Sequence, residues 1–221
     1  SEPATDAPQN NGEAEAVGLN PNGHDYVDLG LPSGTFWATM NVGAVKPAGY
    51  GDYFAWGETS GYADGKEQFS WKNYKWSKGS ATSITKYKID RKVARELQLV
   101  TDQSLQGVNK SEVELELEDD AARAKWGGDW RMPSVEQFAE LNEHCTREWT
   151  TQNRRFGWLF TSKENGKTIF FPAAGYRDKT LFNVSAYGYY WTRNLYIRYS
   201  GGAYVLYFDS STVNTNENYY R

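Results

Sequence analysis

The apolar residues of this chain come in short runs, and turn-forming residues separate one run from the next. The runs are rich in Tyr, Trp, Phe and Val and are bounded by Gly, Pro, Asn or Ser. Runs of this length and composition fit β-strands better than helices. Aromatic residues make up 16% of the sequence and glycines number 21, which favours a loop-rich domain over a helical bundle. The sequence therefore predicts a single α+β domain with antiparallel strands.

Two pairs of these runs surround turn residues and predict β-hairpins. Residues 26–29 and 35–38 flank Pro32-Ser33-Gly34, and residues 158–162 and 168–171 flank Asn165-Gly166. Asn-Gly between two apolar runs is the strongest short-range hairpin signal. Further strands are expected in the glycine-punctuated aromatic stretch 49–57, in the alternating acidic and aliphatic run 112–117, and in the runs 189–192 and 203–208.

Two helices are expected, at about 119–126 and 134–145. Acidic residues at the start of the first helix and basic residues near its end suit the helix macrodipole, and Gly127-Gly128 ends it. In the second helix, Ser134 and Gln137 fit a capping box, and the apolar residues follow helical spacing. One face of the second helix is therefore expected to lie against a core.

The domain organisation follows from a change in composition near residue 24. Residues 1–23 contain no aromatic residue and are rich in Pro, Ala, Asn and acidic residues. Such a segment buries too little apolar surface to offset its ordering entropy, so we expect a flexible tether that also carries His24. Residues 24–221 are expected to form the domain. A surface insertion is expected at about 91–110, whose first part, 91–99, is compatible with a short helix.

Charge and cysteine content exclude several classes of protein. The formal net charge is −4, which argues against nucleic-acid binding because that function needs a basic surface. No apolar run approaches the length that spans a bilayer. No signal peptide is visible and the sequence does not begin with Met, so we expect a mature form without a transmembrane segment. Cys145 is the only cysteine, so no internal disulfide can form.

Several motifs occur in an order that resembles a known family. The most specific is Trp-Gly-Gly-Asp-Trp-Arg-Met-Pro-Ser at 126–134, and the others lie at 26–42, 50–58, 115–122, 171–178 and 189–191. Together they resemble the Fibrobacter succinogenes major paralogous domain, a domain of surface proteins in gut and rumen bacteria. The resemblance runs from about residue 26 to the C-terminus and is poor after residue 91.

This resemblance implies a fold similar to C-type lectins and formylglycine-generating enzymes. It also implies export to the cell surface, often as an outer-membrane lipoprotein anchored through a removed N-terminal region, but it implies no biochemical activity. The chain departs from the family pattern near its end. Relatives continue into a Gly-x-x-Val-Arg strand that is not seen before Arg221, so either the last strand is missing or the sheet is closed in another way.

No catalytic or metal-binding pattern is found in the sequence. An enzyme of the formylglycine-generating type needs reactive cysteines, whereas Cys145 falls on the predicted buried face of the second helix. The tripeptides with which C-type lectins hold calcium do not occur, and the acidic run 112–120 is expected to spread its oxygens along a solvated face. His24 and His144 are too few for a histidine-rich site. We therefore expect no metal, no cofactor and no catalysis.

The segment 187–221 is the strongest candidate for a binding surface. It is dense in Tyr, Asn, Ser, Gly and Arg, most of which are favoured in adaptable binding surfaces. We expect Tyr196, Arg198 and Tyr199 to be exposed together, over buried Trp191 and Leu206. The candidate ligand-binding residues are Arg193, Asn194, Tyr196, Ile197, Arg198, Tyr199, Tyr207, Asp209, Asn214 and Tyr219.

The family resemblance adds the hypothesis that this segment is diversified. C-type-lectin-like proteins that a retroelement diversifies vary positions encoded by adenine-rich codons, and the residue types between 192 and 216 are reachable in that way. The sequence thus predicts a non-catalytic, exported ligand-binding or adhesion module whose ligand is an unknown protein or glycan. One alternative is a structural or assembly subunit of a surface appendage, which an unpaired strand edge would support. The other is a carbohydrate-active enzyme, which needs two carboxylates about 5–10 Å apart in a pocket.

Overall fold

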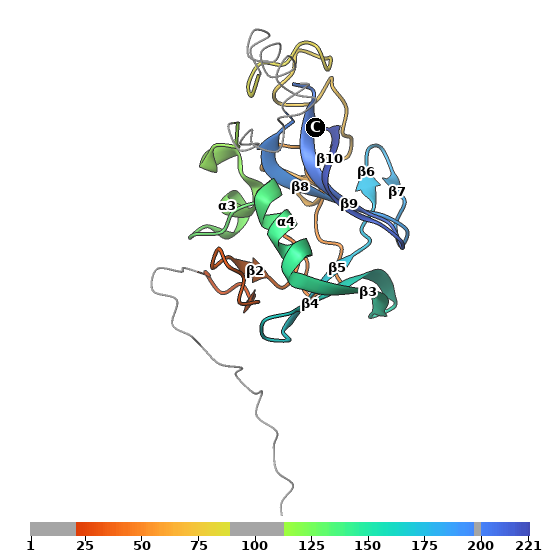
Figure 1. The fold of residues 1–221 in the computed structure, drawn as a ribbon. Coiled ribbons are helices and arrows are strands. Elements are labelled where there is room, and N and C mark those ends of the chain that lie inside the picture. Colours follow the sequence, from red (N-terminus) through yellow and green to blue (C-terminus); the bar gives the residue numbers. More distant parts are fainter. Residues whose placement is uncertain (1–20, 89–112, 197–199) are drawn as a thin grey trace, which may run out of the picture.

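The computed structural model describes residues 21–88, 113–196 and 200–221 (Figure 1). The elements in these ranges are strands, two α-helices and two short 3-10 helices. In chain order they are β1 (Tyr26–Asp28), β2 (Phe36–Ala38), η1 (Tyr62–Asp64), η2 (Leu117–Asp119), α3 (Ala121–Trp126), α4 (Val135–His144), β3 (Cys145–Gln152), β4 (Arg155–Ser162), β5 (Thr168–Pro172), β6 (Tyr176–Arg177), β7 (Leu181–Phe182), β8 (Gly188–Leu195), β9 (Gly202–Phe208) and β10 (Val213–Tyr220).

Antiparallel pairing assembles the strands into small sheets. Two sheets have three strands each, in the orders β3–β4–β5 and β10–β9–β8, and the hairpins β1–β2 and β6–β7 form the others. Figure 1 shows α4 between the two larger sheets, and the helix contacts β3 as well as β8, β9 and β10. The architecture is α+β, as the sequence predicts. No helix in the described ranges has both the length and the apolar character needed to cross a bilayer.

Helix α4 forms where the sequence places it, because both of its ends are specified locally. The Ser134 hydroxyl accepts a hydrogen bond from Gln137 N at 3.0 Å, and Gln137 Oε1 accepts one from Ser134 N at 2.8 Å, so the predicted capping box is present. Phe138 and Leu141 are buried on the inner face. The chain then passes directly into β3 at Cys145. Helix α3 is shorter than predicted, because residues 117–119 form η2 and Asp120 is its N-cap.

One hydrophobic core joins the two larger sheets, α4 and the first hairpin. Phe160 of β4 and Phe208 of β9 are both fully buried in it, with Trp37 of β2 and Phe138 of α4. Cys145 belongs to this core and is 4% exposed, and burial raises the pKa of its thiol. Because residues from β2 through β9 share one cluster, the described elements form one packed unit.

Both predicted hairpins are present, although the second has a longer turn than a two-residue Asn-Gly loop. Five residues, 163–167, connect β4 to β5, and Ser162 N donates to Lys167 O at 2.8 Å across this loop. The Asn165 side chain instead donates to Asp28 O at 3.0 Å, which ties this turn to the first hairpin. A long-range contact therefore overrides the local turn preference.

The stretch 49–57 was expected to contain a strand, but it is irregular. Gly51 has a φ of 74°, and a Cβ on it would lie 2.4 Å from Val42 O. The chain folds back on itself at this point, which only glycine permits, and so an extended strand cannot form.

The run 112–117 was expected to form a strand with alternating burial, and this is also wrong for its described part. Only Glu114 makes a bridge, to Asn194 of β8. The chain then turns into η2, which leaves Leu117 47% exposed where alternation would bury it. Alternation predicts a strand only where the chain stays extended.

Residues 21–24 pack against the domain, although they were expected to belong to the flexible tether. Trp130 Nε1 donates to Pro21 O at 2.7 Å, and Asn22 Nδ2 donates to Trp126 O at 2.7 Å. The His24 ring stacks on Trp126 with 4.3 Å between ring centroids. The motif tryptophans thus provide a platform that composition alone does not reveal. The rest of the predicted tether and the insertion at 91–110 lie outside the described residues.

Candidate functional site

The two faces of the β10–β9–β8 sheet have different roles. Leu206 and Phe208 of β9 lie in the core on the α4 side. Alternation along β9 turns Tyr207 to the other face. The register places Tyr189 of β8 opposite Tyr207, and Tyr219 of β10 opposite Ala203, which has the same parity as Tyr207. Three tyrosines therefore share the face that points away from α4.

Irregular chain between residues 41 and 74 covers part of this outer face, and aromatic side chains fix it there. Each bond joins an aromatic donor to a backbone carbonyl: Trp191 Nε1 to Phe54 O at 2.9 Å, Trp56 Nε1 to Thr192 O at 2.7 Å, and Tyr53 OH to Ala174 O at 2.8 Å. Such side chains bury a large apolar body and still satisfy their polar atom. The loops are thereby held to the sheet without regular secondary structure of their own.

Tyr176, Tyr189 and Tyr219 form a group of rings, called the tyrosine cluster below. The ring centroids are 5.3 Å apart for Tyr176–Tyr189, 5.2 Å for Tyr189–Tyr219 and 5.5 Å for Tyr176–Tyr219. Burial raises the pKa of Tyr189 and, together with a hydrogen bond to Tyr176, that of Tyr219. The Tyr189 and Tyr219 hydroxyls are therefore neutral at physiological pH and can donate hydrogen bonds.

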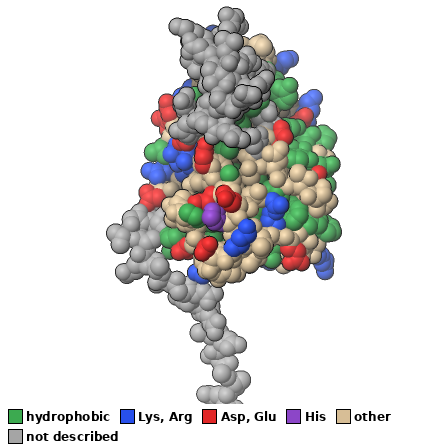
Figure 2. Space-filling model, viewed as in Figure 1, with side chains coloured by type: hydrophobic (Ala, Val, Ile, Leu, Met, Phe, Trp, Pro, Cys, Tyr) green, Lys and Arg blue, Asp and Glu red, His purple; other side chains and the backbone are tan. Residues whose placement is uncertain are grey.

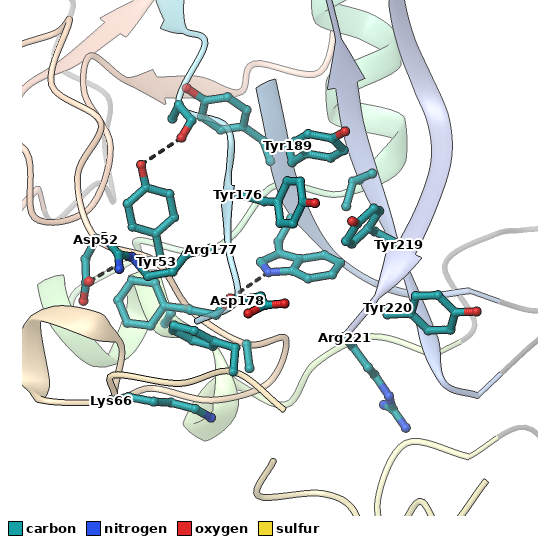
Figure 3. A pocket seen from close by; sticks show the side chains of 18 of the residues that line it. Asp52, Tyr53, Lys66, Tyr176, Arg177, Asp178, Tyr189, Tyr219, Tyr220 and Arg221 are labelled. Carbon is teal, nitrogen blue, oxygen red and sulfur yellow. Dashed lines mark hydrogen bonds between the residues drawn. The ribbon is translucent and has the colours of Figure 1, made fainter. Parts of the chain in front are cut away.

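A cavity of about 470 Å³ opens beside the tyrosine cluster. Figure 3 shows the cluster on one side of it, with Tyr53 and Arg177 together on the other. Phe54 and Trp71 also line it. Figure 2 shows hydrophobic side chains, with tyrosine among them, gathered on the side of the molecule that carries β6 and β7. A concave, mostly aromatic wall with a few polar groups is typical of a ligand-binding site.

Arg177 is a cation without a charged partner in the part of the chain that the structure describes. Its guanidinium carbon lies 3.6 Å from the ring centroid of Tyr62 and 5.5 Å from that of Tyr53. Its Nε is buried and has no hydrogen-bond partner. Burial raises the pKa of Tyr53 to about 12, although the neighbouring Arg177 charge opposes this shift. Lys66, which also lines the cavity, is paired with Glu58.

Two residues expected to bind ligand lie away from this cavity and make hydrogen bonds within the fold. The Asn194 side chain is fully buried, and its Oδ1 accepts a hydrogen bond from Val135 N at 3.0 Å. Arg193 is half-buried and donates to Glu114 Oε2 at 3.0 Å and to Met132 O at 3.1 Å. Both residues connect β8 to the start of α4, and neither lines the cavity beside the tyrosine cluster.

The other candidates fall in several places. Tyr196 packs on Tyr204, with 5.2 Å between ring centroids, on the α4 side of the sheet. Asp209 closes the β9–β10 turn, where its Oδ1 accepts hydrogen bonds from the backbone N–H groups of residues 211 and 212. Asn214 lies opposite Tyr207 in the register. Ile197, Arg198 and Tyr199 lie outside the described residues.

Of the candidate residues that the structure describes, Tyr219 is the one that lines the cavity. Leu206 is buried as expected, whereas Trp191 is half-buried and hydrogen-bonded to a loop. Sequence reasoning missed Tyr176, Tyr189 and Arg177. Parity gave no signal for Tyr189, because Trp191 and Leu195 of the same strand have its parity and read as core residues. Tyr176 and Arg177 lie in one of the motifs that carry the family resemblance, and nothing in their spacing marks them as binding residues.

The acidic run converges more than its alternation predicts. Carboxylate oxygens of Glu116, Glu118 and Asp119 lie within 4.8 Å of one another. The Lys86 ammonium sits among them, with Nζ 2.6 Å from Glu116 Oε2 and 2.7 Å from Asp119 Oδ2. The ammonium groups of Lys86 and Lys75 therefore offset part of the negative charge of this group of acids.

Comparison of the chain with family models, with curated proteins and with solved structures found no match.

Proposed function

We propose that this chain is a non-catalytic binding module that receives a glycan in the cavity beside the tyrosine cluster. The observation that carries the proposal is the cluster itself. Three tyrosine rings, 5.2–5.5 Å apart, line a cavity of about 470 Å³ on a rigid sheet. Tyrosine offers a large contact area at a small cost in side-chain entropy.

A glycan fits this wall better than an apolar ligand does. A sugar ring has a flat face of C–H groups and a rim of hydroxyls, so it matches a tyrosine ring that carries its own neutral hydroxyl. The raised pKa of Tyr189 keeps its hydroxyl neutral, so it can donate a hydrogen bond to a ligand, whereas the Tyr219 hydroxyl is already bonded to Tyr176. Loops fixed to the sheet by aromatic hydrogen bonds keep the wall in place before the ligand binds, which lowers the entropy lost on binding.

The family resemblance supports three further parts of the proposal. The α+β arrangement, with a capped helix after the Arg-Met-Pro-Ser turn, agrees with a C-type-lectin-like fold. A fold of this family would act outside the cell, at the surface, as a ligand-binding or adhesion module. Tyr207 and Asn214 face the same way as Tyr189 in the register, and they belong to the segment proposed to be diversified.

The test is a glycan array followed by titration of the best-binding oligosaccharide. Tyr189→Leu keeps apolar volume but removes the flat ring and the hydroxyl, so we expect affinity to fall by at least about tenfold. Tyr26→Leu is the matched control, since Tyr26 is 38% exposed in β1 and lies outside the cavity. Absence of glycan binding, or equal affinity for both variants, would refute the proposal.

A hydrolytic function is tested with the same bound oligosaccharide. Asp52 and Asp178 line the cavity, but Asp52 Oδ1 already accepts hydrogen bonds from Tyr53 N and Ala63 N at 2.8 Å each. This carboxylate therefore stabilises its loop. Release of new reducing ends on prolonged incubation would show that the module is an enzyme after all.

A structural role is a second candidate, and the edge of the β10–β9–β8 sheet favours it. Within the described residues β10 pairs with β9 on one side only, and open edges can recruit partner strands. A bulge between Asn214 and Glu217 interrupts this edge, which weakens it as a template. Light scattering over a range of concentrations decides the question, because assembly through the edge predicts growing oligomers.

A further inference from the structure

We propose that the glycan carries a carboxylate and that Arg177 binds it. This inference rests on the proposed function, because it names the class of glycan for the same cavity. The observation behind it is a guanidinium at the cavity wall that forms no ion pair among the described residues, although Asp52 and Asp178 also line the cavity.

Arg177 is positioned before any ligand arrives. The centroids of the Tyr62 and Tyr53 rings lie 3.6 and 5.5 Å from its guanidinium carbon. Stacking of this kind restricts a side chain that otherwise samples many rotamers. The bond of Tyr53 OH to Ala174 O, at 2.8 Å, keeps that ring in place.

The guanidinium lacks acceptors in the part of the protein that the structure describes. Its Nε is buried without a partner, and no described carboxylate forms an ion pair with it. The two terminal Nη groups of Arg177 make no hydrogen bond to the described residues and are not buried. They are therefore the accessible part of the side chain. Arg177 lines the cavity, and a planar guanidinium with two open N–H groups matches the two oxygens of a carboxylate.

The other cations at the cavity are already in use. Lys66 is paired with Glu58. The Arg221 guanidinium donates to the backbone carbonyls of Lys86 and Tyr87 at 3.2 and 3.1 Å. Arg177 is therefore the cation that remains available for a ligand among the described residues of the wall. Figure 3 shows Arg177 and the tyrosine cluster on opposite sides of the segment that carries Tyr176 and Arg177, and both line the cavity. An oligosaccharide, rather than a single sugar, would therefore contact the rings with one unit and the guanidinium with an acidic unit.

The experiment uses matched pairs of oligosaccharides that differ only in the acidic group. Oligogalacturonate is compared with its methyl ester, and sialyllactose with its methyl ester, by calorimetric titration at low and high salt. We expect at least one acidic member to bind about tenfold more tightly than its neutral partner, with the preference falling as salt rises.

Variants then assign the preference to one side chain. Arg177→Gln should remove the preference for the acidic oligosaccharide while the neutral partner still binds. Arg177→Lys should keep part of this preference, since the positive charge remains but the two parallel N–H donors of the guanidinium are lost. Arg147→Gln is the control, because Arg147 is exposed on β3 and stacks on Trp158 outside the cavity. If Arg177→Gln does not fold, the inference is tested by comparing the affinities of Arg177→Lys for the acid and for its methyl ester.

The outcomes separate this inference from the proposed function. Equal binding of acidic and neutral partners, or a preference that survives Arg177→Gln, overturns the inference and leaves the glycan module standing. Binding of an acidic peptide, in an Arg177-dependent manner, with no binding of any glycan overturns both. No binding of any glycan refutes the proposed function first.

Discussion

Single residues in this protein often have roles that depend on one partner far away in sequence, and Asp119 is the clearest case. It is 2% exposed. Burial alone would raise its pKa, but hydrogen bonds from Lys86 and Tyr87 outweigh burial and lower the pKa of the carboxyl below its ordinary value. The same contact raises the pKa of Lys86, while burial and the bond to Asp119 raise that of Tyr87 to about 12.

Lys86→Gln should therefore destabilise the protein and change its response to acid. Loss of a charged hydrogen bond to a buried carboxylate should lower the free energy of unfolding by about 1.5–3 kcal/mol at pH 7. A lowered pKa stabilises the fold above the unfolded value of about 4, and this stabilisation is lost as pH falls through the folded value. Without Lys86 the Asp119 pKa rises, so stability should fall less steeply below about pH 4.

Urea unfolding at several pH values measures both effects. Lys78→Gln is the control, because Lys78 is exposed in a neighbouring turn. An acid response as steep in Lys86→Gln as in the parent protein would show that Asp119 does not depend on Lys86.

At the scale of elements, the first turn of α4 both caps the helix and fixes its position among its neighbours. Gln137 does not only complete the capping box: it donates to Thr35 Oγ1 at 3.2 Å and accepts from Arg193 at 3.1 Å. The N-terminus of the helix thus connects the first hairpin with β8. A weakened cap should therefore destabilise the contacts of α4 with both the first hairpin and β8.

Ser134→Ala removes the hydroxyl that accepts from Gln137 N and should cost about 1 kcal/mol of folding free energy. Chemical denaturation monitored by circular dichroism measures the change. Ser210→Ala, at an exposed turn position between β9 and β10, should have almost no effect. Equal effects of the two substitutions would contradict the structural role of the cap.

Elements specified by neighbouring residues could be predicted from the sequence, and elements specified by distant contacts could not. The capped helix and both hairpins follow from local signals. The irregular stretch 49–57 is determined by aromatic hydrogen bonds to strands more than a hundred residues away. The candidate site shows the same limit. Composition pointed to Tyr219, but Tyr176 and Arg177 join it only through tertiary folding.

At the scale of the whole molecule, the shared core predicts cooperative unfolding. Phe208 is fully buried and packs with residues of both larger sheets. Phe208→Ala should lower the free energy of unfolding by about 3–5 kcal/mol. Tryptophan fluorescence and far-ultraviolet circular dichroism should shift together, since one core serves both sheets.

Phe156→Ala is the comparison for this experiment, because Phe156 is 45% exposed on β4. Phe156→Ala should lower the free energy of unfolding much less than Phe208→Ala does. Separate transitions for the two probes would mean that the sheets unfold independently, against the single core described above.

The single thiol of this chain, Cys145, can report how often the core opens. It is buried at the junction of α4 and β3, within the core that both sheets share. A thiol reagent can reach it only while that core is open, so the labelling rate of the unmodified protein reports how often the core opens under native conditions. Because the chain has no second cysteine, every label marks the same event, and an opened molecule can form a disulfide only with a different molecule.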